Sequence, residues 1–334
     1  MSRLLLPFLL AGLVACATVP GIDQGPSAGP ESAMKTVRMV LQDPPLIGTT
    51  PAGQRLYLGG FSGLRYLGPG RNGKLRFLTH TDRGPNADET KDNGKTKRPF
   101  LLPGYQPRIL ILEGDPEAGT LRIEKEIPLL RPDGKKLTGL PQKEGQEVPL
   151  DSVGKAQAYD PYGLDLEGIA QAPNGAFWLV DEYGPSIVRF SPEGKMMEAL
   201  KPGAGLPKIL EQRRLNRGFE GAAILGTRLY AALQSPIGSK ESNLVRIVEV
   251  DLLGRRTLGQ YAYLQEMILD GDDNDRPDKI GDIAVVGPRT LLVMERDGRG
   301  GKNSFKRVYQ VSLEGATNLR LLPEKVSGPG GTLE

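Results

Sequence analysis

The chain has 334 residues and a nearly balanced charge, with 43 Lys and Arg against 40 Asp and Glu. Its 44 Gly and 28 Pro, beside a hydrophobic content of only 38%, favour an all-β fold with many tight turns over a helical one. The balanced charge, with no basic stripe interleaved with aromatic residues, argues against nucleic acid as a partner. One Cys and one His exclude a disulfide framework and a His-rich zinc or iron centre.

The N-terminus has the pattern of a bacterial lipoprotein signal peptide. Arg3 precedes a short apolar run, and the segment ends in Leu13-Val14-Ala15-Cys16. We predict a signal peptide over residues 1–15, lipidation of Cys16, and a flexible Gly/Pro/Ser-rich tether over 16–34. A plain secretory signal with an incidental cysteine is the alternative. We therefore expect a bacterial cell-envelope protein, periplasmic or on the outer surface, that contacts the membrane only through its lipid.

A sequence motif recurs along the folded part, which we place at residues 35–322, ahead of a Gly/Pro-rich tail at 323–334. Each copy has an opener, an apolar run, and a closing turn that usually begins with an acid. The openers are Ser62-Gly63-Leu64, Glu167-Gly168-Ile169, Glu220-Gly221-Ala222 and Gly281-Asp282-Ile283. The closers begin at Asp82, Asp181, Gln234 and Glu295.

Each copy continues into a second pair of short strands joined by a tight turn, for example 107–112 and 121–123. Four strands in a unit that repeats roughly every 40–60 residues predict a β-propeller of four-stranded antiparallel blades. Four blades are evident, and we expect five to seven, with six as the best estimate. Residues 131–159 are a polar insertion or a degenerate blade, and 206–215 is the one segment that favours a short helix.

The openers are the first candidate site. The innermost strands of a propeller line its central channel, so Ser62, Glu167, Glu220 and Asp282 are expected to face one another. Converging carboxylates repel unless a cation lies among them, and hard oxygen ligands in a wide ring favour Ca²⁺. The alternative is a structural role, in which these acids accept hydrogen bonds from backbone N–H groups.

The closers are the second candidate site. Asp82, Asp181 and Glu295 end strands, and two of them are followed by a cation, Arg83 or Arg296. A carboxylate beside a guanidinium can grip a phosphate or carboxylate group, while a salt bridge between blades is the structural alternative.

Several other features favour no chemistry. His80 is expected to be a packed strand residue, Trp178 a core residue, and the acidic run 270–275 a solvated loop. Neither a nucleophile elbow nor a phosphate-binding loop is present in the sequence.

Five blocks taken in order resemble a known family. They are Asp82-Arg83-Gly84-Pro85, Asp165-Leu166-Glu167-Gly168-Ile169-Ala170, Asp181-Glu182-Tyr183-Gly184-Pro185, Asn216-Arg217-Gly218-Phe219-Glu220-Gly221 and Glu295-Arg296-Asp297. The chain resembles the bacterial phytase-like family named for the esterase-like activity of phytase. The resemblance implies a secreted or periplasmic β-propeller that hydrolyses phosphate or other esters. Gln234, an amide at the third closer, leaves the ring of acids incomplete.

The first functional hypothesis is a metal-assisted phosphoesterase acting as a monomer on a small phosphate ester or other ester. Its predicted roles are Ca²⁺ held by Glu167, Glu220 and Asp282; catalysis by Asp181 or Glu182 as base with Arg83 and Arg296; and substrate binding by Asp82, Asn216, Arg217 and Glu295.

Two other hypotheses stay open. One is a non-catalytic surface propeller that binds a sugar, a peptide or a protein partner. The other is a lactone or carboxylic-ester hydrolase with one calcium ion in its channel.

Overall fold

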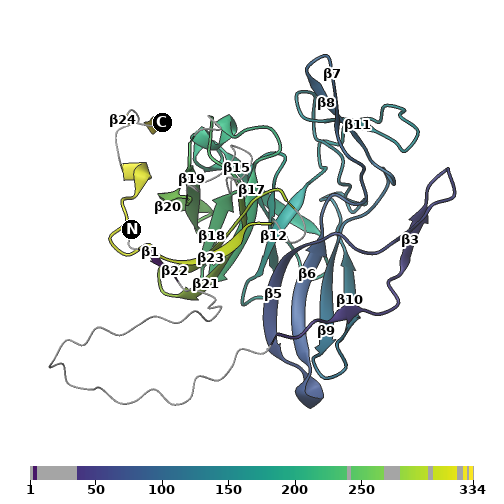
Figure 1. Cartoon of the computed structure of the whole chain (residues 1–334). Helices are drawn as coiled ribbons and strands as arrows, with labels where there is room; N and C mark the ends of the chain where they lie inside the picture. Colours follow the sequence, from purple (N-terminus) through teal and green to yellow (C-terminus); the bar gives the residue numbers. More distant parts are fainter. Residues whose placement is uncertain are drawn as a thin grey trace, which may run out of the picture.

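The computed structural model describes residues 3–5, 36–238, 242–266, 279–299, 304–321, 326–328 and 331–333. These residues form strands and three short 3-10 turns, η1 (Arg71–Gly73), η2 (Lys208–Gln212) and η5 (Leu319–Leu321), with no α-helix among them (Figure 1). The all-β prediction is confirmed, and the segment expected to favour a helix forms only η2. Cys16, the tether and the acidic run 270–275 lie outside the described residues.

None of the helical segments in the described part of the chain is long and apolar enough to span a bilayer.

Four antiparallel sheets have the layout of propeller blades. The first contains β5 (Phe61–Pro69), β6 (Leu75–Thr81), β9 (Arg108–Asp115) and β10 (Thr120–Pro128), with β2 (Val40–Leu41) parallel to β10. The second contains β12 (Leu166–Gln171), β13 (Phe177–Asp181), β14 (Ser186–Phe190), β15 (Met196–Pro202) and β16 (Gly205–Leu206). The third contains β17 (Phe219–Leu225), β18 (Arg228–Leu233), β19 (Leu244–Asp251) and β20 (Arg256–Leu264). The fourth contains β21 (Lys279–Gly287), β22 (Thr290–Arg296) and β23 (Lys306–Ser312), with β1 (Arg3–Leu5) paired to β23.

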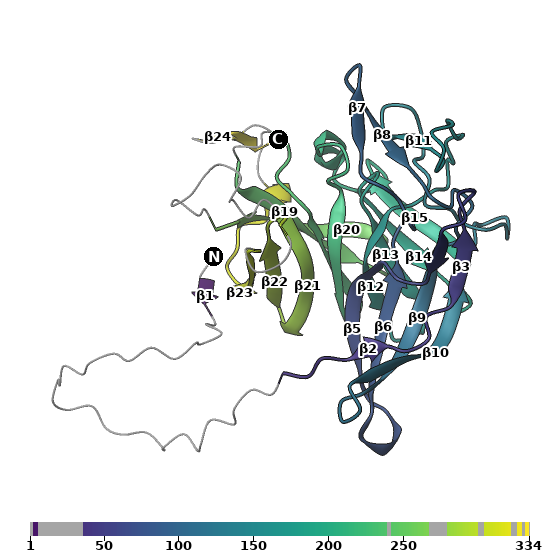
Figure 2. The same cartoon turned by 45° about the vertical axis from the view of Figure 1, so that its right-hand side comes forward.

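The expected number of blades, five to seven, is not confirmed, because the described residues contain four such sheets and no closed ring. The remaining strands form three small sheets instead. These are β3 (Leu46–Thr49) with β4 (Arg55–Tyr57), β7 (Thr90–Asp92) with β8 (Lys95–Pro99) and β11 (Val148–Leu150), and β24 (Val326–Gly328) with β25 (Gly331–Leu333). The polar insertion thus supplies β11 to a small sheet that stands above the first two of these sheets (Figure 2).

The first strands of the four sheets pack side by side in chain order, β5 with β12, β12 with β17, and β17 with β21. Glycines permit this approach: a Cβ on Gly168 would lie 2.6 Å from the backbone N of Ala222, and one on Gly221 would lie 2.6 Å from that of Ile283. A side chain at either place would push the sheets apart. The opener glycines therefore set the spacing between the sheets.

Each first strand carries a β-bulge at its opener. The pairing with the second strand skips one residue, which is Gly63, Glu167, Glu220 and Gly281 in the four sheets. A bulged residue leaves the ladder, so its side chain can be aimed differently from its neighbours. The structural equivalents of Glu167 are therefore Gly63, Glu220 and Gly281, and Asp282 lies one residue further along.

Apolar side chains from facing sheets fill the space between them. Trp178, Phe219 and Tyr230 belong to the larger cluster, which joins the second, third and fourth sheets, and Phe177 and Phe190 belong to the cluster between the first and second. Trp178 is 3% exposed, so its predicted core position is confirmed.

Arg65, on β5, ties the first sheet to the third and the fourth. Its Nη1 donates to Oδ2 of Asp282 at 2.8 Å, and its Nη2 donates to Oδ1 at 3.1 Å and to the carbonyl of Ile283 at 3.0 Å. It also donates to the carbonyl of Ala222. One guanidinium on β5 therefore donates to acceptors on both β17 and β21, across the space between the first strands of the sheets.

We expect Arg65→Met to destabilise the protein by about 2–3 kcal/mol, because Asp282 and two backbone carbonyls lose a charged donor in a mostly buried place. Urea unfolding followed by circular dichroism measures the loss. Arg76→Met, which breaks the exposed pair with Glu124, is the matched control and should cost less than about 1 kcal/mol. Equal losses in the two variants would contradict the role of Arg65.

Candidate functional site

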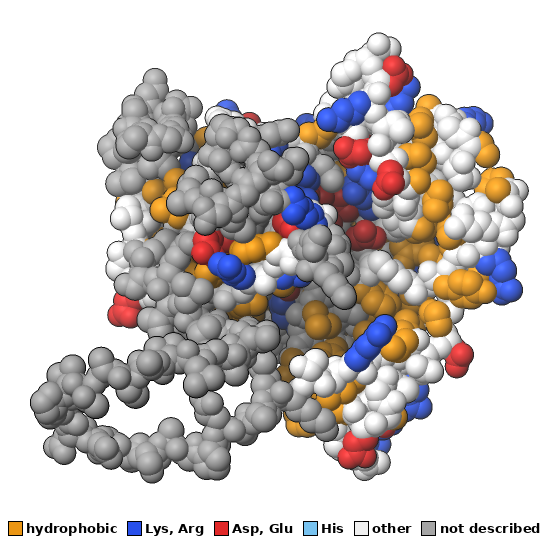
Figure 3. Space-filling model, viewed as in Figure 1, with side chains coloured by type: hydrophobic (Ala, Val, Ile, Leu, Met, Phe, Trp, Pro, Cys, Tyr) orange, Lys and Arg blue, Asp and Glu red, His pale blue; other side chains and the backbone are white. Residues whose placement is uncertain are grey.

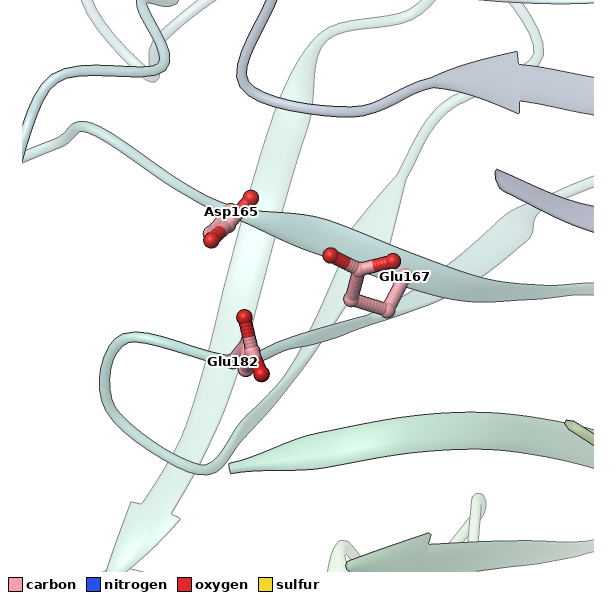
Figure 4. A group of neighbouring side chains, drawn as sticks. All are labelled: Asp165, Glu167 and Glu182. Atoms are coloured by element: carbon pink, nitrogen blue, oxygen red, sulfur yellow. The ribbon is translucent and has the colours of Figure 1, made fainter. Parts of the chain in front are cut away.

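Three carboxylates meet where the second sheet faces the axis. Asp165 lies just before β12, Glu167 is the bulged residue of β12, and Glu182 follows β13. One oxygen from each lies within 4.8 Å of the others, so the group could hold a metal ion. Figure 4 shows the three side chains directed toward a common space between the strands. We call these three residues the acidic cluster.

Asp165 is the most unusual member of the acidic cluster. Its side chain is 0% exposed, and neither carboxylate oxygen receives a hydrogen bond. Arg83 Nη1 lies 2.8 Å from Oδ2, but without hydrogen-bond geometry. Buried polar atoms are nearly always hydrogen-bonded, so a buried carboxylate with one ion pair and no hydrogen bond has capacity left for a ligand. A hard cation is the ligand that this donor set fits.

Glu220 extends the acidic cluster toward the third sheet. Gln234 Nε2 donates to Glu182 Oε1 and to Glu220 Oε2, both at 2.6 Å, and Arg296 Nη2 donates to Glu220 Oε1 at 2.6 Å. The amide at the third closer thus bridges two acids as a neutral donor. A carboxylate at that position would add a further negative charge to the group.

Burial and repulsion between neighbouring acids raise the pKa values of this group. Burial raises the pKa of Glu167 well above its ordinary range, and Glu220, Asp165 and Glu182 raise it further. Burial and then Asp165 likewise raise the pKa of Glu182. Burial raises the pKa of Asp82 to about 6, with a contribution from Asp165. Neighbouring arginines lower the pKa values of Glu182 and Glu220, but burial prevails, so the acids bind protons more readily than ordinary carboxyl groups.

Three arginines border the acids, and they differ in their access to solvent. Arg83 is 12% exposed and is held by Glu147 at 3.1 Å and by Asn216 at 3.3 Å, with its guanidinium 5.8 Å from the ring centre of Tyr183. Arg296 and Arg217 are 28% and 29% exposed. The last two can therefore reach a ligand more readily than Arg83. Figure 3 shows acidic and basic side chains together in a hollow of the surface.

Asp181, predicted to be catalytic, lies beside the acidic cluster and not in it. Its carboxylate accepts hydrogen bonds from the backbone N–H groups of Asp165, Tyr183 and Gly184, and from Ser186 Oγ. It is fully buried, and burial raises its pKa to about 7 despite these donors. The arrangement suits a carboxylate that fixes the β13–β14 turn.

Asp282 and Glu295 also lie outside the acidic cluster, where other groups bind their carboxylates. Both oxygens of Asp282 are taken by Arg65, because the bulge of β21 falls on Gly281 and shifts Asp282 by one residue. Glu295 is 0% exposed and accepts hydrogen bonds from Tyr263 Oη at 2.5 Å and from the backbone N–H of Glu266 at 3.0 Å. Neither acid belongs to the group within 4.8 Å.

The remaining predicted residues lie around the acids. Ser62 Oγ donates to Glu167 Oε2 at 2.9 Å, so the first and second openers do meet. Asp82 is half-buried and accepts a hydrogen bond from the backbone N–H of Gly84. Asn216 bonds Arg83, and Arg217 Nη1 lies 3.9 Å from Glu182 Oε1.

His80 confirms its expected role as a packed residue. Its side chain is 0% exposed, and its ring nitrogens contact the carbonyls of Thr81 and Glu167. Burial lowers its pKa to about 4, so it is neutral near pH 7.

Sequence reasoning missed Asp165 and Glu147. A signal existed for Asp165, which stands two residues before Glu167 in the same quoted block, where alternate strand residues share a face. No local pattern points to Glu147, since the insertion that carries it is brought to Arg83 by tertiary folding alone.

The fold and the acidic cluster define an all-β protein of blade-like sheets with a buried carboxylate site at the ends of its inner strands. The chain belongs to the phytase-like family described as "Esterase-like activity of phytase", whose family model matches residues 56–326.

Other similarities are weaker. An uncharacterized secreted protein of Arthroderma benhamiae is 28% identical over 237 residues, which cover 54% of this chain and 46% of that protein, so the match spans about half of the relative's length. A protein of unknown function from Bacteroides caccae is 11% identical with a TM-score of 0.38, covering 80% of this chain and 73% of that one. A putative 6-phosphogluconolactonase from Bacteroides uniformis is 15% identical with a TM-score of 0.36, covering 79% and 71%. Structural likenesses this weak carry no argument about chemistry.

Proposed function

We propose that the protein is a metal-assisted ester hydrolase, acting on phosphate or other esters, with Ca²⁺ held by Asp165, Glu167 and Glu182. The observation that carries the proposal is the Asp165 carboxylate, which is fully buried, is paired with Arg83 but accepts no hydrogen bond, and lies within 4.8 Å of two further acids. Family membership supports a hydrolase. Calcium has the size and the preference for oxygen ligands that an all-carboxylate group fits.

The roles of the bordering residues follow from their exposure and partners. A bound cation supplies Lewis-acid polarisation of an ester oxygen. Arg296 and Arg217, the more exposed arginines, neutralise negative charge on the ester. Asp82, half-buried with a pKa of about 6, accepts a proton from water near neutral pH. Arg83 and Asp181 position the acids, and Glu220 orients Arg296.

We further propose that the blade-like sheets belong to a β-propeller and that the protein works outside the cytoplasm. A secreted relative supports export, and the lipoprotein-like N-terminus supports attachment through Cys16. The lipid would be the only contact with a membrane.

A second candidate is a non-catalytic binding protein whose cation only stabilises the fold. The observation that favours it is the deep burial of Asp165 and Glu182, at 0% and 3% exposed, which leaves a cation between them little contact with a substrate. In that case the acidic cluster would affect melting but not turnover.

Turnover separates the two candidates. The purified protein is assayed with 4-nitrophenyl phosphate, 4-nitrophenyl acetate and a lactone, after chelation and again after calcium is restored. We expect calcium-dependent hydrolysis of at least one ester, and a loss of about a hundredfold in kcat/KM for Glu167→Gln. Glu124→Gln, at an exposed pair, is the control and should retain full activity. No turnover of any of these esters with excess calcium between about pH 5 and 9 would reject the hydrolase proposal.

A further inference from the structure

A separate cleft lies behind the turn that carries Asp181 and Glu182. It has a volume of about 650 Å³, a size typical of small-molecule sites. Its walls come from the insertion loop at Gln142 to Gln146, the β13–β14 turn at Gly184 to Ser186, the end of β15, and η2 with the residue after it. No residue of the acidic cluster lines it.

One half of this cleft is cationic. Lys143, Lys201 and Arg213 line it, against the single acid Glu211. Within the described ranges, neither lysine forms an ion pair with an acid. Arg213 is fixed by a hydrogen bond to the carbonyl of Tyr183, while its Nε is buried without an acceptor. The two lysines are exposed at the edge of the cleft, where cations without an acidic partner favour an anionic ligand.

The other half is apolar. A contiguous pocket of about 270 Å³ shares Gln142, Pro161, Ser186 and Lys201 with the cationic half. Its remaining lining is mostly apolar, from Pro132, Tyr162, Leu164, Val188, Met196, Met197 and Ala199. The one acid there, Glu198, is paired with Arg189 and Arg255. Lys201 stands at the junction, so a charged group there would have an apolar wall beside it.

The walls of the cleft are held in place before any ligand binds. Gln142 Nε2 donates to the carbonyl of Gly163 at 2.9 Å, and Gln146 Nε2 donates to the carbonyl of Tyr183 at 3.3 Å. Gln146 Oε1 also accepts from the backbone N–H of Gln142 at 2.6 Å. A preformed cavity avoids the entropic cost of ordering its loops on binding.

We propose that this cleft is a binding site for a small amphipathic anion: a carboxylate or phosphate-type group held by Lys143, Lys201 and Arg213, with an aromatic or branched apolar body against Tyr162, Leu164 and Met197. A ligand with only a charged group, or with only an apolar surface, would complement one half of the cleft and not the other. The site does not depend on hydrolysis at the acidic cluster.

Calorimetric titration with 2-naphthoate tests the site, with naphthalene-2-phosphonate as the phosphate-type probe. We expect saturable binding of at least one anion, and affinity at least about tenfold weaker for 2-naphthalenemethanol, which lacks charge, and for inorganic phosphate, which lacks the apolar body. The double variant K143Q/K201Q should bind the anions about tenfold or more weakly, and so should Met197→Asp. Met197 is largely exposed, so an aspartate there should not disturb the fold.

Two controls separate this proposal from the hydrolase proposal. Lys208→Gln removes an exposed lysine of η2 that does not line the cleft, and its binding should be unchanged. Glu167→Gln should retain naphthoate binding even if turnover is lost. The proposal is overturned if neither anion binds at millimolar concentration, if the neutral alcohol binds as tightly as the anions, or if K143Q/K201Q and Lys208→Gln bind the probe equally well.

Discussion

Calcium added to the chelated protein should raise its melting temperature by about 5 to 10 °C near pH 7.5, and by much less near pH 5. At a hundredfold excess over Kd, a ligand specific for the folded state adds about 2.7 kcal/mol of stability. The ligands must be deprotonated to bind calcium, so protons compete with the metal as the pH falls.

The sign of the pH dependence follows from the raised pKa values. Burial and mutual repulsion raise the pKa values of Asp165, Glu167 and Glu182 above those of the unfolded chain, and that of Asp82 to about 6. The metal-free fold therefore binds protons more tightly than the unfolded chain. This tighter proton binding stabilises the metal-free fold. The stabilisation is fully present below the pKa values of the unfolded chain, near 4, and is lost as the pH rises through the pKa values of the folded protein. We expect calcium to replace those protons near neutral pH.

Differential scanning fluorimetry across this pH range, with calcium, magnesium or chelator, measures the effect. Asp165→Asn is the matched variant, since it keeps the shape of the side chain and removes one charge from the acidic cluster. It should melt higher than the wild type in chelator near pH 7.5 and should gain little from calcium. A calcium shift as large at pH 5 as at pH 7.5, or an undiminished shift in Asp165→Asn, would contradict a metal site in the acidic cluster.

The sequence predicted the fold class better than the details of the site, and the bulges explain why. Gly and Pro content and strand periodicity indicate an all-β fold, and the repeated sequence motif marks the four blade-like sheets. The motif does not show which residue of the opener forms the β-bulge. In β21 that residue is Gly281 and not Asp282, so aligning the acids by eye moves one of them to another face.

The closers illustrate a second limit. Asp181 and Glu182 are adjacent in sequence, yet Asp181 accepts hydrogen bonds from backbone N–H groups and Glu182 belongs to the acidic cluster. Which of the two side chains joins the acidic cluster depends on the turn, and a pattern of residue types cannot reveal it. The cleft beyond the turn depends still more on tertiary structure, because five separate stretches of the chain between Gln142 and Arg213 line it.

Arg83→Met should be the most damaging single change in the interior of the molecule, costing about 3–5 kcal/mol of stability. Arg83 is the cation that faces Asp165 and shares Glu147 with Arg98, and both acids are nearly inaccessible, at 0% and 1% exposed. Burial disfavours the charged guanidinium, but the neighbouring acids prevail and hold its pKa well above its ordinary value. Methionine would leave Asp165 both buried and uncompensated.

Chemical unfolding of Arg83→Met measures this loss, with Arg122→Met, at an exposed pair with Glu113, as the control within about 1 kcal/mol of the wild type. The double variant Arg83→Met/Asp165→Asn should recover a large part of the stability, because the stranded charge is gone. Calcium should also rescue the single variant more than it stabilises the wild type, since the cation then has a full unit of negative charge to neutralise. A double variant no more stable than Arg83→Met, together with a calcium effect unchanged from the wild type, would show that Arg83 acts through packing on Tyr183 and not through the charge of Asp165.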